Sequence, residues 1–357
     1  MSGGQPTSVL ERETIVDTDV HLSVPEAELA RYVDRPYRDW LTAPDVQLKS
    51  SEWDPTLGGK IESRSLLTPD QLERDVMETL HVDHPIINVF RNLSRLSQTD
   101  AALELMVGAN DYLFDRFLDE GDYLGLATVA TQKPDRAAEE LDRVGDHDQI
   151  VGVFIPTTGP TPPLGDPEYD VLYEAMADRD LTPVYHGAAN SGFDVGFPKY
   201  NQAFEKFITT HINAHLWSQA MTLTSLVVQG VPEKFPDLDF VFLEAGIGWV
   251  PYMMFRLNKE AAMRRSEVPL LEREPEEYIR EKMYFASQPL GEPMDGEHMQ
   301  SLLDMVGAES LLFASDYPHW DFDHPSELDA HLRARFTPEE RSAVLHENAK
   351  RVFDLPI

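Results

Sequence analysis

Four side chains that could bind a metal ion follow short apolar runs of the sequence. Asp19 and His21 end the first run, His186 ends the fifth and Asp316 ends the eighth. Carboxylate and imidazole groups are common ligands of divalent cations, and thiolate ligands are excluded because the chain contains no cysteine. Any one of the four could be a structural polar residue, but their recurrence at three run ends favours a shared metal site.

Strand geometry would bring these residues together. Side chains two positions apart on a strand share a face, so Asp19 and His21 would point the same way. An isolated Asp-x-His pair is more often a hydrogen-bonded pair than a metal site. When parallel strands close into a barrel, however, their carboxyl ends meet at the face where catalytic groups lie. The mixed nitrogen and oxygen donors predict one divalent metal ion, zinc or manganese.

The elements that must position these residues alternate regularly along the chain. The apolar runs, rich in β-branched and aromatic residues, are 14–21, 85–90, 124–129, 150–155, 182–186, 240–244, 283–286 and 311–316. Helical patterns cover 99–118, 167–178, 200–229, 249–265 and 296–306, and further helices begin near 68, 133 and 337. Eight strand–helix alternations predict a (β/α)8 TIM barrel, with a doubly wound open sheet as the alternative.

The length of 357 residues suits one barrel domain spanning 1–357. Residues 22–67 interrupt the alternation after strand one and contain many Pro, Trp, Gly and charged residues. Because this segment leaves the carboxyl face of the barrel, we interpret it as a cap or lid inserted over the pocket. An oligomer contact is the compatible alternative.

The composition is strongly acidic. Sixty-three acidic residues against thirty basic ones give a formal net charge of -33, which disfavours nucleic acid and anionic membranes as partners. An acidic coat spread along the whole chain indicates a halophilic source, in which salt screens the repulsion; an acidic mesophilic protein is the alternative. No run is long enough to span a membrane, and residues 1–13 lack a hydrophobic signal core, so we expect a cytoplasmic protein.

Several stretches resemble the amidohydrolase-related family that includes aminocarboxymuconate-semialdehyde decarboxylase and the resorcylate-type decarboxylases. The most specific are Ser-Asp-Tyr-Pro-His at 315–319 and Asn-Ala-Lys-Arg-Val-Phe at 348–353. The other matching stretches are 16–21, 183–187, 235–238 and 242–246. The resemblance implies a barrel with one catalytic divalent metal, assigns Asp19, His21, His186 and Asp316 as its ligands, and suggests a homodimer.

The sequence departs from this family at two positions. Asp19 stands where many members have His and some have Glu, and Glu244 stands where the decarboxylases have a catalytic His at the end of strand six. Glu244 and Asp316 are therefore the candidate catalytic groups for proton transfer. The alternative for Glu244 is a structural carboxylate bonded to backbone amides.

Three further residues are candidate substrate contacts. His319 closely follows Asp316, and it could also orient that ligand. His215 and Trp217 follow strand five, and His215 would share a helix face with His211. A position on the helix surface is an equally good interpretation of His215.

These features predict an enzyme acting on a small molecule. The first hypothesis is hydrolysis, in which metal-activated water attacks a carbonyl carbon while Asp316 or Glu244 carries the proton. The alternative is non-oxidative decarboxylation of an aromatic or unsaturated acid. A non-catalytic binding protein on an enzyme scaffold is the third hypothesis.

Overall fold

The fold is a barrel of parallel strands. The computed structural model describes residues 13–43, 65–89, 91–187, 206–291, 293–355 and 357. Within these residues eight parallel strands pair in sequence order, and a parallel bridge between Val20 and Tyr317 joins the first strand to the segment after the last. The strands are β1 (Val16–His21), β2 (His84–Asn88), β3 (Leu124–Thr128), β4 (Ile150–Pro156), β5 (Thr182–His186), β6 (Phe240–Leu243), β7 (Met283–Ala286) and β8 (Leu311–Leu312). The predicted TIM barrel is confirmed, and the open doubly wound alternative is wrong because the strand order never reverses.

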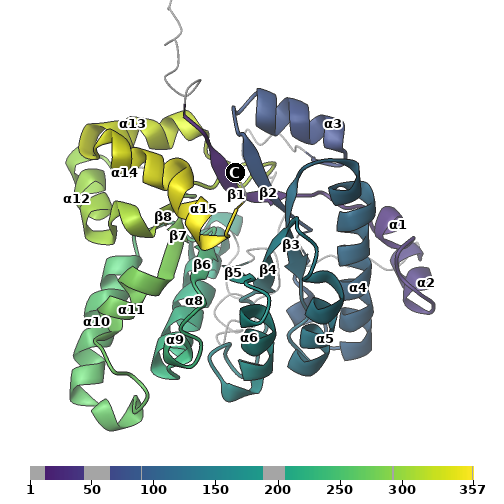
Figure 1. The fold of residues 1–357 in the computed structure, drawn as a ribbon, viewed down its shortest axis with the longest axis horizontal. Helices are drawn as coiled ribbons and strands as arrows, with labels where there is room; N and C mark the ends of the chain where they lie inside the picture. The colour runs from purple at the N-terminus through teal and green to yellow at the C-terminus, as the bar shows by residue number, and fades with distance from the viewer. Residues whose placement is uncertain (1–12, 44–64, 90, 188–205, 292, 356) are drawn as a thin grey trace, which may run out of the picture.

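Helices surround this barrel (Figure 1). The larger ones are α4 (Thr99–Arg116), α5 (Pro134–Val144), α6 (Asp170–Ala177), α8 (Phe207–Val228), α10 (Val250–Met263), α11 (Pro275–Lys282), α12 (Gly296–Val306) and α13 (Pro325–Arg335). The short ones are α1 (Glu26–Leu29), α2 (Tyr37–Thr42), α3 (Pro69–Gln71), α9 (Val231–Lys234), α14 (Pro338–Ser342) and α15 (Asn348–Val352). None of the helices in the described ranges is both long and apolar enough to cross a membrane.

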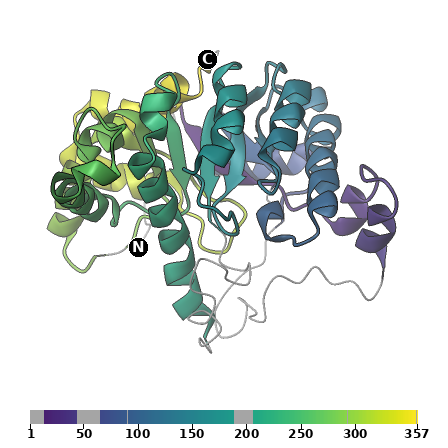
Figure 2. The ribbon, with the colours of Figure 1, turned by 90° about the horizontal axis from the view of Figure 1, so that it is seen from below.

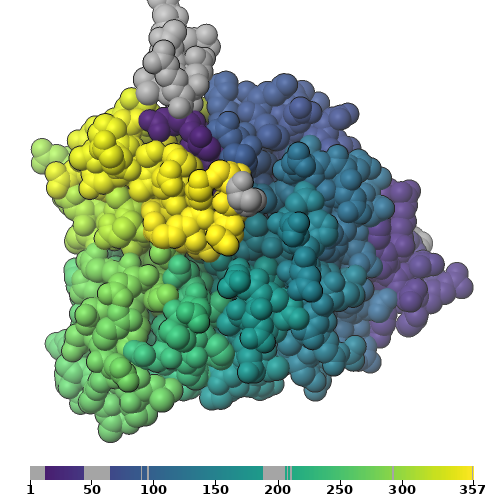
Figure 3. All heavy atoms as spheres, viewed as in Figure 1, coloured from purple at the N-terminus to yellow at the C-terminus, as the bar shows by residue number. Residues whose placement is uncertain are grey.

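The barrel interior is apolar and closed at one end by the C-terminus. Inward-facing residues such as Phe154, Val184 and Leu312 form one buried cluster that also contains Phe353 and Leu355. The hydroxyl of Thr182, at the start of β5, donates to the carbonyl of Val352. Figures 1 and 3 show the C-terminal segment, in yellow, covering the middle of the barrel. Any reaction chemistry must therefore lie at the opposite end, where the strands finish.

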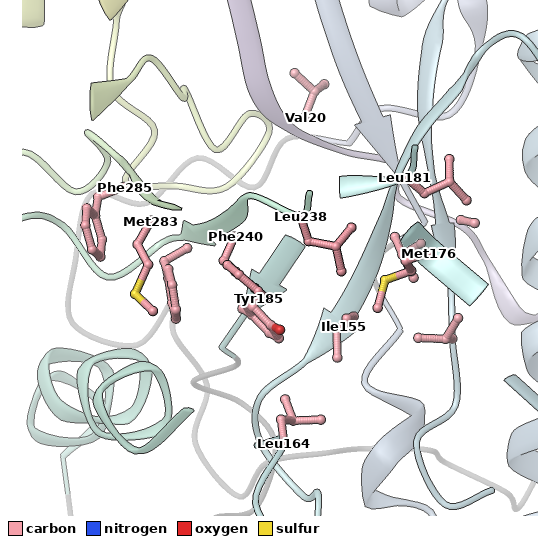
Figure 4. Packing of buried hydrophobic residues seen from close by; sticks show 14 of the residues in the cluster. Val20, Ile155, Leu164, Met176, Leu181, Tyr185, Leu238, Phe240, Met283 and Phe285 are labelled. Carbon is pink, nitrogen blue, oxygen red and sulfur yellow. The ribbon is translucent and has the colours of Figure 1, made fainter. Parts of the chain in front are cut away.

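A second, larger cluster fills the space between the strands and the helices. Figure 4 shows part of it, including Tyr185, Phe240 and Phe285. The Tyr185 ring lies 5.1 Å from that of Phe242, and its hydroxyl is 2.8 Å from the hydroxyl of Tyr173 on α6. The buried phenol group thus has a hydrogen-bond partner, which removes the cost of hiding it from water.

The elements differ from the sequence expectation in a few places. The helix expected near residue 68 continues as a π-helix, Leu72–Glu78, and helices α11 and α13 were not predicted. Part of the segment 22–67 forms α1 and α2, while 44–64 lie outside the described residues. Its role as a cap stays a prediction. Residues 200–205 of the helix expected at 200–229 also lie outside the described residues.

One glycine tests how tightly the barrel is packed. A Cβ atom added to Gly152 of β4 would lie 2.7 Å from the backbone carbonyl oxygen of its partner Thr182 on β5. We expect Gly152→Ala to lower the free energy of unfolding by about 1–3 kcal/mol, because neither backbone can yield easily. Gly296→Ala is the matched control, since nothing lies within 4 Å of its added Cβ. Equal denaturant midpoints for the two variants would contradict this account of the barrel wall.

Candidate metal centre

The four predicted ligands meet at the carboxyl ends of the strands. Asp19 and His21 lie in β1, His186 ends β5, and Asp316 follows β8. All four are buried, and each offers a ligand atom within 4.8 Å of the others. Alternation along the strands explains this, because His186 shares the inner face with Val184, and Asp316 lies two residues beyond buried Ala314.

Both imidazole rings are oriented through the nitrogen that faces away from the cluster. His21 Nδ1 lies 2.8 Å from the side-chain oxygen of Asn88, and His186 Nδ1 lies 2.5 Å from the carbonyl oxygen of Gly187. An oxygen acceptor at Nδ1 keeps the proton of a neutral ring there and leaves the Nε2 lone pair available. The Nε2 atoms of both rings lie 3.3 Å from a carboxylate oxygen of Asp19.

Two amide side chains that the sequence analysis missed hold the carboxylates. The Asn88 amide donates to Asp19 Oδ1, and the Gln288 amide donates to Asp316 Oδ2. Asn88 ends β2, and Gln288 follows β7 by two residues. Asn88 lies inside the second apolar run, 85–90, so a search for uncharged polar residues within every run, rather than for charged ones alone, would have found it.

Backbone strain marks the ends of two strands. Glu244, directly after β6, has φ of +52°, and Asp316 has φ of +64°. Residues other than glycine rarely adopt this left-handed conformation, and each instance costs on the order of 1–3 kcal/mol unless the surroundings require it. Glu244 thus shares with Asp316 both its place at the barrel mouth and its strained backbone, which favours a functional interpretation of Glu244.

The buried charges shift one another's proton affinities. Burial lowers the pKa of His21, but the Asp19 charge and the hydrogen bond that His21 donates to Asp316 outweigh it and raise that pKa to about 9. Burial likewise opposes ionisation of Asp316, yet His319 and His21 bring the pKa of that carboxyl below its usual value. Burial, together with the charges of Asp316, Asp321 and Asp19, raises the pKa of Glu244 well above its usual range.

The donor set fits a divalent cation. Two carboxylates would neutralise such an ion, and two oriented imidazoles would supply lone pairs to it. The combination of nitrogen and oxygen donors suits zinc or manganese equally. Asp19, His21, His186 and Asp316 are thus the residues that could hold one ion at this mouth.

The candidate substrate contacts lie at different distances from this cluster. His319 stacks on His21 with ring centroids 4.5 Å apart, and its Nδ1 lies 2.7 Å from Asp316 Oδ1. His215 is buried on α8, with its Nε2 3.4 Å from Glu244. Trp217 is 49 % exposed and donates from its indole nitrogen to Asn213, so the structure does not bring it into the cluster. A substrate contact by Trp217 stays a prediction.

Comparison with known proteins identifies the relatives of this chain. The family described as amidohydrolase matches residues 16–355. Gamma-resorcylate decarboxylase from Rhizobium sp. (strain MTP-10005) is 26 % identical over 271 residues, which cover 71 % of this chain and 77 % of that protein.

Solved structures agree on the fold. The crystal structure of 5-carboxyvanillate decarboxylase from Sphingomonas paucimobilis superposes with a TM-score of 0.71 at 19 % identity, covering 96 % of this chain and 100 % of that one. The 5-carboxyvanillate decarboxylase of Novosphingobium aromaticivorans, complexed with manganese and 4-hydroxy-3-methoxy-5-nitrobenzoic acid, gives a TM-score of 0.71 at 18 % identity, with 97 % of each chain covered.

The orientation of His21 provides a test of the centre. Asn88→Ala removes the oxygen that faces His21 Nδ1 and the amide that donates to Asp19. We expect the affinity for manganese or zinc to fall about 10- to 100-fold, as is usual when a partner that orients a ligand is lost. Asn258→Ala is the control, because that amide bonds to Glu276 instead. Competition with a fluorescent chelator measures both; equal affinities would refute this role of Asn88.

Proposed function

The chain belongs to the amidohydrolase family, and from that premise we propose that it catalyses the metal-dependent, non-oxidative decarboxylation of an aromatic acid bearing a hydroxyl group. The observation that carries this proposal is the buried group of Asp19, His21, His186 and Asp316 at the barrel mouth. Such a centre can hold a carboxylate and a phenolic oxygen of one substrate together, which a purely apolar pocket could not.

Decarboxylation replaces hydrolysis as the leading hypothesis. The curated relatives that match this chain are named gamma-resorcylate decarboxylases, from two Rhizobium sources and from Rhodococcus jostii (strain RHA1). The residues alone did not separate the two reactions, because either one can use a divalent cation beside an aspartate. The proposal also includes the identity of the metal ion, which is zinc or manganese.

The metal would supply positive charge that binds the substrate oxygens and stabilises electrons left on the ring as carbon dioxide departs. In this proposal Asp316 moves the proton. Its Oδ1 accepts from His319 and its Oδ2 accepts from Gln288, so it is held as a carboxylate in a fixed orientation. We assign to Asp316 the uptake of the phenolic proton and its delivery to the ring carbon that loses carbon dioxide. The product hydroxyl then regains a proton from water.

Flat side chains near the mouth suit an aromatic substrate. The His319 ring is stacked on that of His21, and the Trp320 ring lies 5.2 Å from that of His211. Both His319 and Trp320 are partly exposed, as groups that meet a ligand from solvent must be. Aromatic rings favour offset-stacked or edge-to-face contacts with one another, which would position a benzoate ring over the centre.

The reaction is tested by measuring carbon dioxide release from gamma-resorcylate with manganese- and zinc-loaded protein. We expect release by the wild type, and for Asp316→Asn a rate lower by about 100-fold or more, as is typical when a proton-transferring group is removed. Asp304→Asn, at a surface ion pair with Arg335, should keep the full rate. Hydrolysis of an aryl ester without carbon dioxide release from any hydroxybenzoate would instead support the hydrolase hypothesis.

A further inference from the structure

A second group of metal-binding side chains lies beside the first. It consists of His211 and His215 on α8 and Glu244 after β6, and we propose that these residues, with Asp321, bind a second divalent cation, which makes the centre binuclear. The ligand atoms of the two histidines and the glutamate all lie within 4.8 Å of one another.

Helical spacing places the two imidazoles together. His211 and His215 are four residues apart on α8, so they share one face, and their ring centroids are 5.4 Å apart. Two histidines at this spacing on a helix are a recurrent zinc-binding arrangement. Figure 2 shows α8 extending past the other helices on the side away from the C-terminus, which is the side where the strands end. The first turns of α8, which carry both histidines, therefore stand over the barrel mouth.

Carboxylates complete the set from two other elements. Glu244 Oε2 lies 3.4 Å from His215 Nε2, and Asp321 Oδ2 lies 3.5 Å from His211 Nε2. These separations are longer than good hydrogen bonds between ring nitrogen and oxygen, yet they are short enough for one ion to contact both atoms of each pair. Two imidazoles and two carboxylates are a donor set suited to zinc or manganese.

Glu244 also connects this group to the first centre. Its Oε2 lies 3.2 Å from His186 Nε2, and Glu244 additionally forms a metal-capable group with His21, Asp316 and His319. The same oxygen, Oε2, faces His186 of the first centre and His215 of this group, so Glu244 lies between the two positions. Neighbouring ions in two-metal enzymes are typically about 3.5–4 Å apart and share ligands in this way.

The charge balance favours a second cation. Among the described residues, no lysine or arginine forms an ion pair with Glu244 or Asp321, and Glu244 is only 5 % exposed. One divalent ion would neutralise Asp19 and Asp316 and leave Glu244 and Asp321 with only imidazole rings beside them. A buried carboxylate is costly to ionise unless a cation offsets its charge. Two divalent ions would match the four carboxylates, and the strained backbone of Glu244 is consistent with a side chain held in place for a ligand.

A second cation would give the carboxyl groups of Glu244 and Asp316 different roles. Glu244 would stay ionised as a ligand, which leaves Asp316 to move the proton. This division rests on the proposed decarboxylation, whereas the cation site itself does not depend on the reaction.

Metal counting tests the proposal directly. The full chain is stripped with a chelator, reloaded with manganese and desalted, and bound metal is measured by mass spectrometry and electron paramagnetic resonance. We expect about two ions per chain with a spin-coupled signal, as in other two-metal sites. His211→Ala and His215→Ala should each retain about one ion and lose the coupling. His298→Ala, an exposed histidine on α12, is the control and should keep both ions.

The outcomes separate this inference from the proposed function. One ion per wild-type chain would overturn the second site and leave decarboxylation standing, and two ions that survive both histidine variants would overturn its location. No bound ion would overturn both proposals. If His215→Ala does not fold, Asp321→Asn and His211→Ala, a change at a partly buried residue, provide the test. An unchanged circular dichroism spectrum together with retention of one ion shows that these variants fold.

Discussion

Carboxylates gathered inside a barrel mouth are the constraint on which the rest of this structure depends. Asp19 and Asp316 have no exposed surface, and Glu244 has almost none. Taking an ion out of water costs several kcal/mol even after the protein relaxes. The amides of Asn88 and Gln288, the ring of His319 and, in our proposals, divalent cations are what make this concentration of charge tolerable.

The barrel supplies the rigidity that such a site requires. Its interior is filled by apolar side chains and closed at the far end by Phe353 and Leu355, so the strand ends cannot easily spread apart. Two positions at the mouth adopt left-handed backbone conformations, which only a firmly packed surrounding can maintain. Stability at the base of the barrel thus permits strain and buried charge at its mouth.

The negative surface charge repels an anionic substrate, whereas a centre that holds cations would attract it. A net charge of -33 repels an anionic acid at long range, although salt shortens that range. Cations at the mouth would reverse the sign locally, within a few ångströms of their ligands. An aromatic acid would therefore gain its binding energy only after entering the mouth, which favours recognition by contact rather than by long-range steering.

The sequence by itself determined the barrel and the four residues of the first centre. Both follow from local rules: apolar runs alternate with helical patterns, side chains alternate along strands, and the carboxyl ends of parallel strands converge. Asp19, His21, His186 and Asp316 obey those rules, so their meeting could be predicted without knowing any distance. The family resemblance also drew attention to Glu244.

Only the tertiary structure decided what surrounds that centre. The placement of His211 and His215 beside Glu244 depends on how α8 packs over the mouth, and the proximity of Asp321 depends on the path of the chain after β8. No sequence period encodes such contacts, because they join elements whose relative positions are set by packing.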